Sequence, residues 1–168
     1  MYRKIFSVKD FNEKFKNRSV VKSYDSFFKI LTYFQVVANF ADKFVVIADY
    51  RKNSVKLGTS YKFIPVEVLP LAYKPITLEI EKKFGGKVQL RMAKAKAGPV
   101  VTDNGNLLLD WYFDASVVPS EESMKSYWTG VNSSLMCTPG VVDTGLFVDF
   151  AKMAYFGMED GTVKTVSV

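Results

Sequence analysis

The stretch that decides the fold is FVVIA, Phe44–Ala48, a continuous apolar run that ends at Asp49. A run of this kind is typical of a strand buried on both faces of a parallel sheet. The preceding Ser-Tyr-Asp-Ser segment, residues 23–26, is suited to cap a helix, which we expect over 27–43. A helix followed by such a strand indicates an α/β layer.

A different pattern occupies residues 65–148. Helices are predicted over 70–84 and 120–137, and strands over 65–69, 88–92, 99–103, 107–113, 141–142 and 146–148. The candidates for the apolar side of the first helix are Leu71, Ile76, Leu78, Ile80 and Phe84. Asn104-Gly105 is a hairpin signal between two of these strands. The order strand, helix, strand, strand, helix, strand is that of a ferredoxin-like unit. Short strands expected over 152–156 and 163–166 place this unit as an insertion in the α/β sheet.

Three parts of the chain are predicted from these patterns. Residues 1–35 form a divergent basic leader, whose first 22 residues indicate a weak amphipathic helix or a disordered arm. Residues 36–64 and 149–168 form a partial Rossmann-like parallel sheet, and residues 65–148 form the inserted ferredoxin-like α+β (βαββαβ) domain. The predicted fold class is therefore α/β.

The composition excludes several kinds of chemistry. The 168 residues contain no histidine and one cysteine, Cys137, so a catalytic triad, a histidine-ligated metal and an internal disulfide are excluded. Acid–base chemistry would have to use Asp, Glu, Lys or Tyr. A lone thiol fits a reducing compartment, and no apolar run is long enough to span a bilayer, so we expect a cytoplasmic protein without a membrane partner.

The positive charge gathers at the start of the chain. Residues 1–40 hold eight Lys or Arg against three Asp or Glu, a net charge of +5 out of +6 for the whole chain. A basic segment with interleaved aromatic residues either contacts nucleic acid or an acidic surface, or forms the solvated face of a helix. No nucleic-acid-binding motif accompanies the charge, so we favour the solvated face and expect no nucleic-acid partner.

A few polar residues are candidates for a site. Asp103-Asn104-Gly105-Asn106 either lines a polar ligand site or simply meets the needs of a hairpin turn, and the pattern favours the turn. Asp49 and Lys52 follow the buried strand, and ligands bind at the carboxyl ends of strands in open α/β sheets. A lysine there either holds a phosphate or is a solvated loop residue. Cys137 is expected to be partly buried.

Seven motifs identify a resemblance. The chain closely resembles ribose-5-phosphate isomerase type A, particularly the eukaryotic form, from about residue 36 onward, with the motifs in order and at family spacing. They are residues 44–52, 65–70, 84–86, 90–92, 97–106, 139–147 and 155–161.

The resemblance implies a fold and a function. The family interconverts ribose 5-phosphate and ribulose 5-phosphate in the pentose phosphate pathway through an enediol, with a carboxylate base and with no metal or organic cofactor. It combines a Rossmann-like domain with a ferredoxin-like lid and assembles as a dimer or tetramer. Lys52 matches the family's sugar-phosphate-binding lysine. We therefore expect a sugar-phosphate partner, and a homo-oligomer or pairing with a full-length subunit.

The catalytic residues of the family do not match. Aligned without a gap from Leu31-Thr32, the family's catalytic Glu falls on Phe34 and the Lys after it on Gln35, and residues 26–66 contain no Glu. The family's Ser-Gly-Ser-Thr and Asp-Gly-Ala-Asp-Glu loops are also absent from the sequence. We therefore expect no catalytic residue here and a truncated chain that is inactive alone. The alternative is a non-catalytic module for sugar-phosphate binding or subunit assembly.

Overall fold

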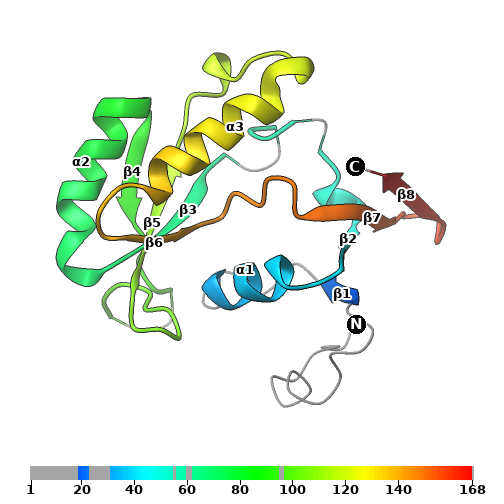
Figure 1. Ribbon diagram of the computed structural model, residues 1–168, viewed down its shortest axis with the longest axis horizontal. Coiled ribbons are helices and arrows are strands. Elements are labelled where there is room, and N and C mark those ends of the chain that lie inside the picture. The colour runs from blue at the N-terminus through cyan, green and yellow to red at the C-terminus, as the bar shows by residue number, and fades with distance from the viewer. Residues whose placement is uncertain (1–18, 23–30, 55, 60–61, 95–96, 168) are drawn as a thin grey trace. The chain divides into compact units, whose positions relative to one another are not determined.

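The computed structural model describes residues 19–22, 31–54, 56–59, 62–94 and 97–167. The chain divides into two compact units. The first unit comprises residues 1–26, 33–54 and 149–168, and the second comprises residues 27–32 and 55–148. Each unit contains one four-stranded sheet (Figure 1).

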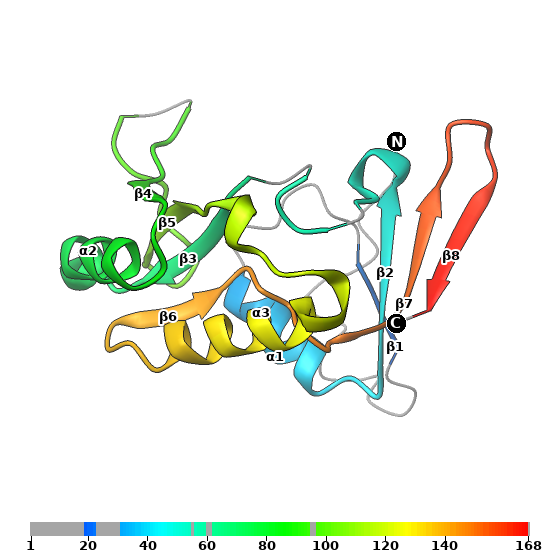
Figure 2. The same ribbon diagram turned by 90° about the horizontal axis from the view of Figure 1, so that it is seen from above.

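The sheet of the first unit is largely parallel. Its strands run in the order β1-β2-β7-β8, where β1 pairs with β2 and β2 with β7 in parallel, and β8 runs antiparallel to β7 (Figure 2). The strands are β1 (Ser19–Lys22), β2 (Lys43–Asp49), β7 (Ala151–Gly157) and β8 (Val163–Ser167). The prediction of a mixed α/β protein with a parallel sheet is therefore confirmed.

Three predictions for this part of the chain need correction. Helix α1 spans Leu31–Asn39 and stops short of the predicted residue 43, because Lys43 already belongs to β2. The strand β2 is not buried along both faces, since Ile47 is 39% exposed. Residues 19–22 form a strand rather than a helix or an arm, because their backbone pairs along β2. The rest of the predicted arm and the start of the predicted helix lie outside the described residues.

The second unit has the element order strand, helix, strand, strand, helix, strand. Its antiparallel sheet has the strand order β4-β5-β3-β6. A short 3-10 turn, η4 (Pro70–Ala72), leads into the first helix, and another, η5 (Ala115–Val117), precedes the second. The elements are β3 (Ile64–Val68), α2 (Tyr73–Phe84), β4 (Lys87–Leu90), β5 (Leu107–Tyr112), α3 (Glu121–Met136) and β6 (Val141–Thr144).

Alternation along β3 separates the core from a polar face. Ile64, Val66 and Val68 belong to one apolar cluster with residues of both α2 and α3, so both helices cover the same face of the sheet. The residues between them, Pro65 and Glu67, point to the opposite face. This arrangement leaves a carboxylate buried on the side of the sheet away from α2 and α3.

Three expectations for the second unit are also wrong. Leu71 and Leu78 are not on the buried side of the helix, since they are 86% and 68% exposed. Residues 99–103 are not a continuous strand, since they make only isolated bridges, from Pro99 to Met92 and from Val101 to Leu107. Residues 146–148 are not a strand, because β6 ends at Thr144.

Candidate functional site

Lys52 lies on a short turn at the end of β2, in the first unit. The 3-10 turn η3 (Tyr50–Lys52) follows β2 directly, and Asp49 is its N-cap. The Arg51 backbone N–H donates to Asp49 Oδ1 at 3.0 Å, and the Asn53 N–H donates to the Tyr50 carbonyl at 2.9 Å. The turn is therefore closed at both ends by hydrogen bonds within five consecutive residues.

The Arg51 side chain also donates hydrogen bonds to the capping carboxylate of Asp49. Arg51 Nε lies 2.7 Å from Asp49 Oδ1, and Nη2 lies 3.2 Å from Oδ2. These hydrogen bonds and the nearby positive charges hold the pKa of Asp49 below its ordinary value. Asp49 is thus a carboxylate at neutral pH and a weak proton acceptor.

The turn stands at an edge of the sheet where ligands bind in open α/β proteins. Asp49 is in register with Gly157 at the end of the parallel strand β7, so two strands end together at η3. Ligands bind outside the carboxyl ends of such strands. Lys52 itself is half-buried beside the exposed Arg51, and it makes contacts within the protein. The structure therefore places Lys52 where the sequence analysis expects it.

A buried carboxylate organises a polar cluster in the second unit. Glu67 on β3 has no exposed surface. Its Oε1 accepts hydrogen bonds from Thr102 Oγ1 and Asn106 Nδ2, both at 2.8 Å, and its Oε2 accepts one from Thr32 Oγ1 at 3.0 Å. Two segments distant in sequence, one at residue 32 and one at residues 102–106, therefore donate to one carboxylate, which has a donor for each oxygen.

The turn at residues 102–106 serves this carboxylate. Thr102 N–H donates to the Asn106 carbonyl at 2.8 Å, and Gly105 N–H donates to the Thr102 carbonyl at 2.9 Å. Gly105 has φ +80°, a conformation that glycine adopts at little cost. The side chain of Asn106 is engaged with Glu67, whereas Asp103 and Asn104 are exposed. The residues of the predicted polar cluster therefore form a turn, as the turn interpretation expects, and Asn106 also binds the buried Glu67.

A second buried acid faces Glu67. Asp143 on β6 is directly opposite Glu67 in the β3–β6 register and is 5% exposed. Burial raises the pKa of Asp143 to about 6, Glu67 adds to the rise, and a hydrogen bond from the Thr144 N–H at 2.7 Å opposes it. Sequence analysis misses both acids. The sequence does contain a signal for Glu67, because it is a charged residue in the middle of the otherwise apolar strand Pro65-Val66-Glu67-Val68.

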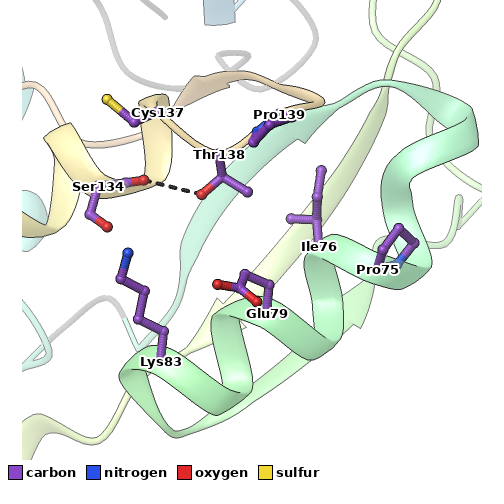
Figure 3. A pocket seen from close by; sticks show the side chains of 8 residues that line it. All are labelled: Pro75, Ile76, Glu79, Lys83, Ser134, Cys137, Thr138 and Pro139. Carbon is purple, nitrogen blue, oxygen red and sulfur yellow. Dashed lines mark hydrogen bonds between the residues drawn. The ribbon is translucent and has the colours of Figure 1, made fainter.

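A shallow groove also lies between α2 and the end of α3. Its volume is about 440 Å³, and Figure 3 shows the Lys83 side chain of α2 directed toward Ser134 near the end of α3. Cys137 lines the groove and is exposed, so the expectation that it is partly buried is wrong. The reason is that the helix ends at Met136, which leaves Cys137 at its outer end. The groove is lined by Pro75, Ile76, Glu79, Lys83, Ser134, Cys137, Thr138 and Pro139.

Two further features bear on the kind of site. Among the described residues, no three His, Cys, Asp or Glu side chains come together in a way that would hold a metal ion. The described helices also include none that is both long and apolar enough to cross a membrane.

The fold and the turn at Lys52 define a mixed α/β protein with a candidate anion site at the carboxyl edge of a parallel sheet. The family described as Ribose 5-phosphate isomerase A (phosphoriboisomerase A) matches residues 14–161. The chain therefore belongs to the ribose 5-phosphate isomerase A family.

Individual relatives agree with this family. The chain is 52% identical over 134 residues to ribose-5-phosphate isomerase from Homo sapiens, covering 79% of this chain and 40% of that protein. It is 42% identical over 132 residues to the probable ribose 5-phosphate isomerase of Caenorhabditis elegans, covering 79% of this chain and 50% of that protein. The chain thus spans 40–50% of the length of these two relatives.

Solved structures show the same fold. A D-ribose-5-phosphate isomerase in complex with phospho-erythronic acid superposes with a TM-score of 0.75 at 29% identity, covering 90% of this chain and 65% of that one. The ribose 5-phosphate isomerase A from Methanocaldococcus jannaschii gives a TM-score of 0.72 at 28% identity, covering 90% and 66%.

Proposed function

We propose that this chain binds a pentose phosphate through the η3 turn, with Lys52 contacting the phosphate. The single observation that carries this proposal is the placement of Lys52 at the carboxyl ends of two parallel strands, in a member of a sugar-phosphate isomerase family. A lysine ammonium binds phosphate as a point charge. The related isomerase structure with phospho-erythronic acid supports a phosphorylated sugar acid or sugar as the class of ligand.

We propose further that binding is not followed by isomerisation in this chain alone. Moving a proton between two carbons needs a positioned base, which is typically worth 10²–10⁴-fold in rate. The resemblance puts Phe34 where the family has its catalytic Glu, and residues 26–66 contain no Glu. Asp49 is a poor substitute, because its hydrogen bonds to Arg51 keep its pKa low.

Binding and turnover of ribose 5-phosphate test these two statements separately. We expect the wild-type chain to bind ribose 5-phosphate in a calorimetric titration and the Lys52→Ala variant to bind at least tenfold more weakly. Lys43→Ala is the matched control, because Lys43 is an exposed lysine at the amino end of β2, at the opposite edge of the same sheet. Wild-type binding unchanged in Lys52→Ala would refute the phosphate role. Ribulose 5-phosphate formation that exceeds background would refute the inactive chain.

The second unit has the organisation of a ferredoxin-like domain, which we propose is the lid domain of the family. The support is the βαββαβ element order together with the strand order β4-β5-β3-β6. The division of the chain at residues 55 and 148 supports the proposed insertion at 65–148. Protection of amides in residues 62–94 from hydrogen exchange when ribose 5-phosphate binds would support the lid, and unchanged exchange would count against it.

Subunit assembly is a second candidate function, favoured by one surface. Leu71 and Leu78 are large apolar side chains that are 86% and 68% exposed, seven residues apart on η4 and α2. Apolar side chains exposed together are common at protein interfaces. We expect light scattering to show a concentration-dependent dimer, or a complex with a full-length subunit. Leu71→Lys combined with Leu78→Lys should abolish it. A wild-type chain that is monomeric with and without that subunit would refute this candidate.

A further inference from the structure

Asp49 determines the shape of the turn that carries Lys52. Its Oδ1 accepts from both the Arg51 N–H at 3.0 Å and Arg51 Nε at 2.7 Å, and its Oδ2 accepts from Nη2 at 3.2 Å. One carboxylate therefore fixes the backbone and the side chain of the residue that precedes Lys52.

The turn needs such a support because it is short. A 3-10 turn of three residues has few internal hydrogen bonds and poor hydrogen-bond geometry. Its backbone is closed by the hydrogen bond from the Asn53 N–H to the Tyr50 carbonyl, at 2.9 Å. Hydrogen bonds to an ionised acceptor are stronger than neutral ones, so the cap contributes more order than the closing bond.

We propose that Asp49 is a positioning residue for the phosphate site, which holds η3 so that Lys52 is presented to the phosphate. This inference rests on the proposed binding of a pentose phosphate at Lys52. Asp49 itself does not contact the ligand in this proposal, because its oxygens are occupied by Arg51.

Whether removal of Asp49 weakens or tightens phosphate binding distinguishes a positioning role from a purely electrostatic one. Asp49 is an anion beside the proposed anion site, and its lowered pKa keeps it charged at neutral pH. If charge alone mattered, removing this carboxylate would tighten phosphate binding, because a like charge would be gone. Positioning gives the opposite result, because the loss of the cap disorders the turn and weakens binding.

Two substitutions at Asp49 make the test. Asp49→Ala removes both the cap and the charge, whereas Asp49→Asn removes the charge and keeps an oxygen that accepts from the Arg51 N–H. We expect calorimetry with ribose 5-phosphate to show about three- to tenfold weaker binding for Asp49→Ala, the range of a lost cap. The affinity of Asp49→Asn should stay within about threefold of wild type.

Asp114 provides a matched control in the second unit. It is the N-cap of the 3-10 turn η5, and its Oδ1 accepts from the Ser116 N–H at 2.8 Å, so it supports a turn of the same kind as η3. Asp114→Ala removes a capping carboxylate from the unit that does not contain Lys52 and should leave the affinity unchanged. Equal weakening in Asp114→Ala and Asp49→Ala would show a general loss of order and overturn the inference.

The failure of the inference differs from the failure of the proposed function. A wild-type chain that binds ribose 5-phosphate, with an Asp49→Ala variant that binds equally or more tightly, would overturn only the positioning role. A wild-type chain that does not bind at all would refute the proposed function and the inference with it. Faster amide exchange at Arg51 and Asn53 in Asp49→Ala than in Asp49→Asn is the expected structural readout, and equal exchange would contradict it.

Discussion

The facing acids Glu67 and Asp143 make the stability of the second unit depend on pH. The pKa of Asp143 is raised to about 6 in the folded chain, against an ordinary value of 3.8. A raised pKa means that the folded state binds the proton more tightly than the unfolded state does. The stabilisation is therefore fully present below pH 4 and is lost as the pH rises through about 6.

We expect Asp143→Asn to remove this dependence. A shift of about two pKa units corresponds to about 3 kcal/mol, and relaxation of the surroundings reduces this to roughly 1–2 kcal/mol. Asparagine resembles the protonated acid, and its side-chain oxygen still accepts from the Thr144 N–H. The variant should therefore be about 1–2 kcal/mol more stable than wild type at pH 7.5 and equally stable at pH 4.

Urea unfolding followed by tryptophan fluorescence measures this difference. Both tryptophans of the chain, Trp111 and Trp128, are buried in the core of the second unit, so the signal reports on that unit. The difference between variant and wild type isolates Asp143 from other groups that titrate in the same range. A difference that is the same at pH 4 and pH 7.5, or a variant that is less stable at pH 7.5, would refute the reasoning.

Two further predictions concern the second unit, both measured by the same unfolding assay. Glu67→Leu should lower the free energy of unfolding by about 2–4 kcal/mol, because it leaves buried donors unpaired. Glu67→Gln should lower it by less than half as much, since an amide both accepts and donates. Equal losses in the two variants would contradict this account. Gly86→Ala should cost more than about 2 kcal/mol, because Gly86 has φ +75° and a Cβ would lie 2.3 Å from the Tyr112 carbonyl. Gly105→Ala, with φ +80° and open space around it, should cost about 1–2 kcal/mol, and an equal cost for both would refute the steric argument.

Local patterns in the sequence predict most of the elements and one part of the site. The run Phe44–Ala48 and the polar residues after it locate β2 and the Lys52 turn, because a strand and its following turn are encoded by adjacent residues. Helix α2 is also predicted, but not all of the side chains expected to face the core do so. Leu71 and Leu78 have the hydrophobicity of core residues, and only the packing of α2 through Ile76 and Ile80 shows that they lie outside.

Long-range pairing explains what the sequence does not reveal. The acids Glu67 and Asp143 are 76 residues apart, and they face each other only because β6 pairs beside β3 in one particular register. The donors to Glu67 come from Thr32, Thr102 and Asn106, at sequence separations of 35 to 39 residues. No local pattern in the sequence encodes such long-range contacts, and their one local sign is a charged residue within an apolar strand.

The same distinction between local and long-range contacts underlies the proposal that this chain binds a pentose phosphate without isomerising it. The hydrogen bonds that cap and close the Lys52 turn lie within residues 49–53, directly after β2, and the turn also contacts β7 of the same sheet. Isomerisation has a further requirement beyond phosphate binding. A base must be held within hydrogen-bond reach of a carbon-bound proton by elements that are distant in sequence. The resemblance to the family puts Phe34 where the family has its catalytic Glu. The proposal that this chain binds a pentose phosphate without isomerising it therefore rests on a turn whose capping bonds are local and on a base whose position depends on residues distant in the sequence.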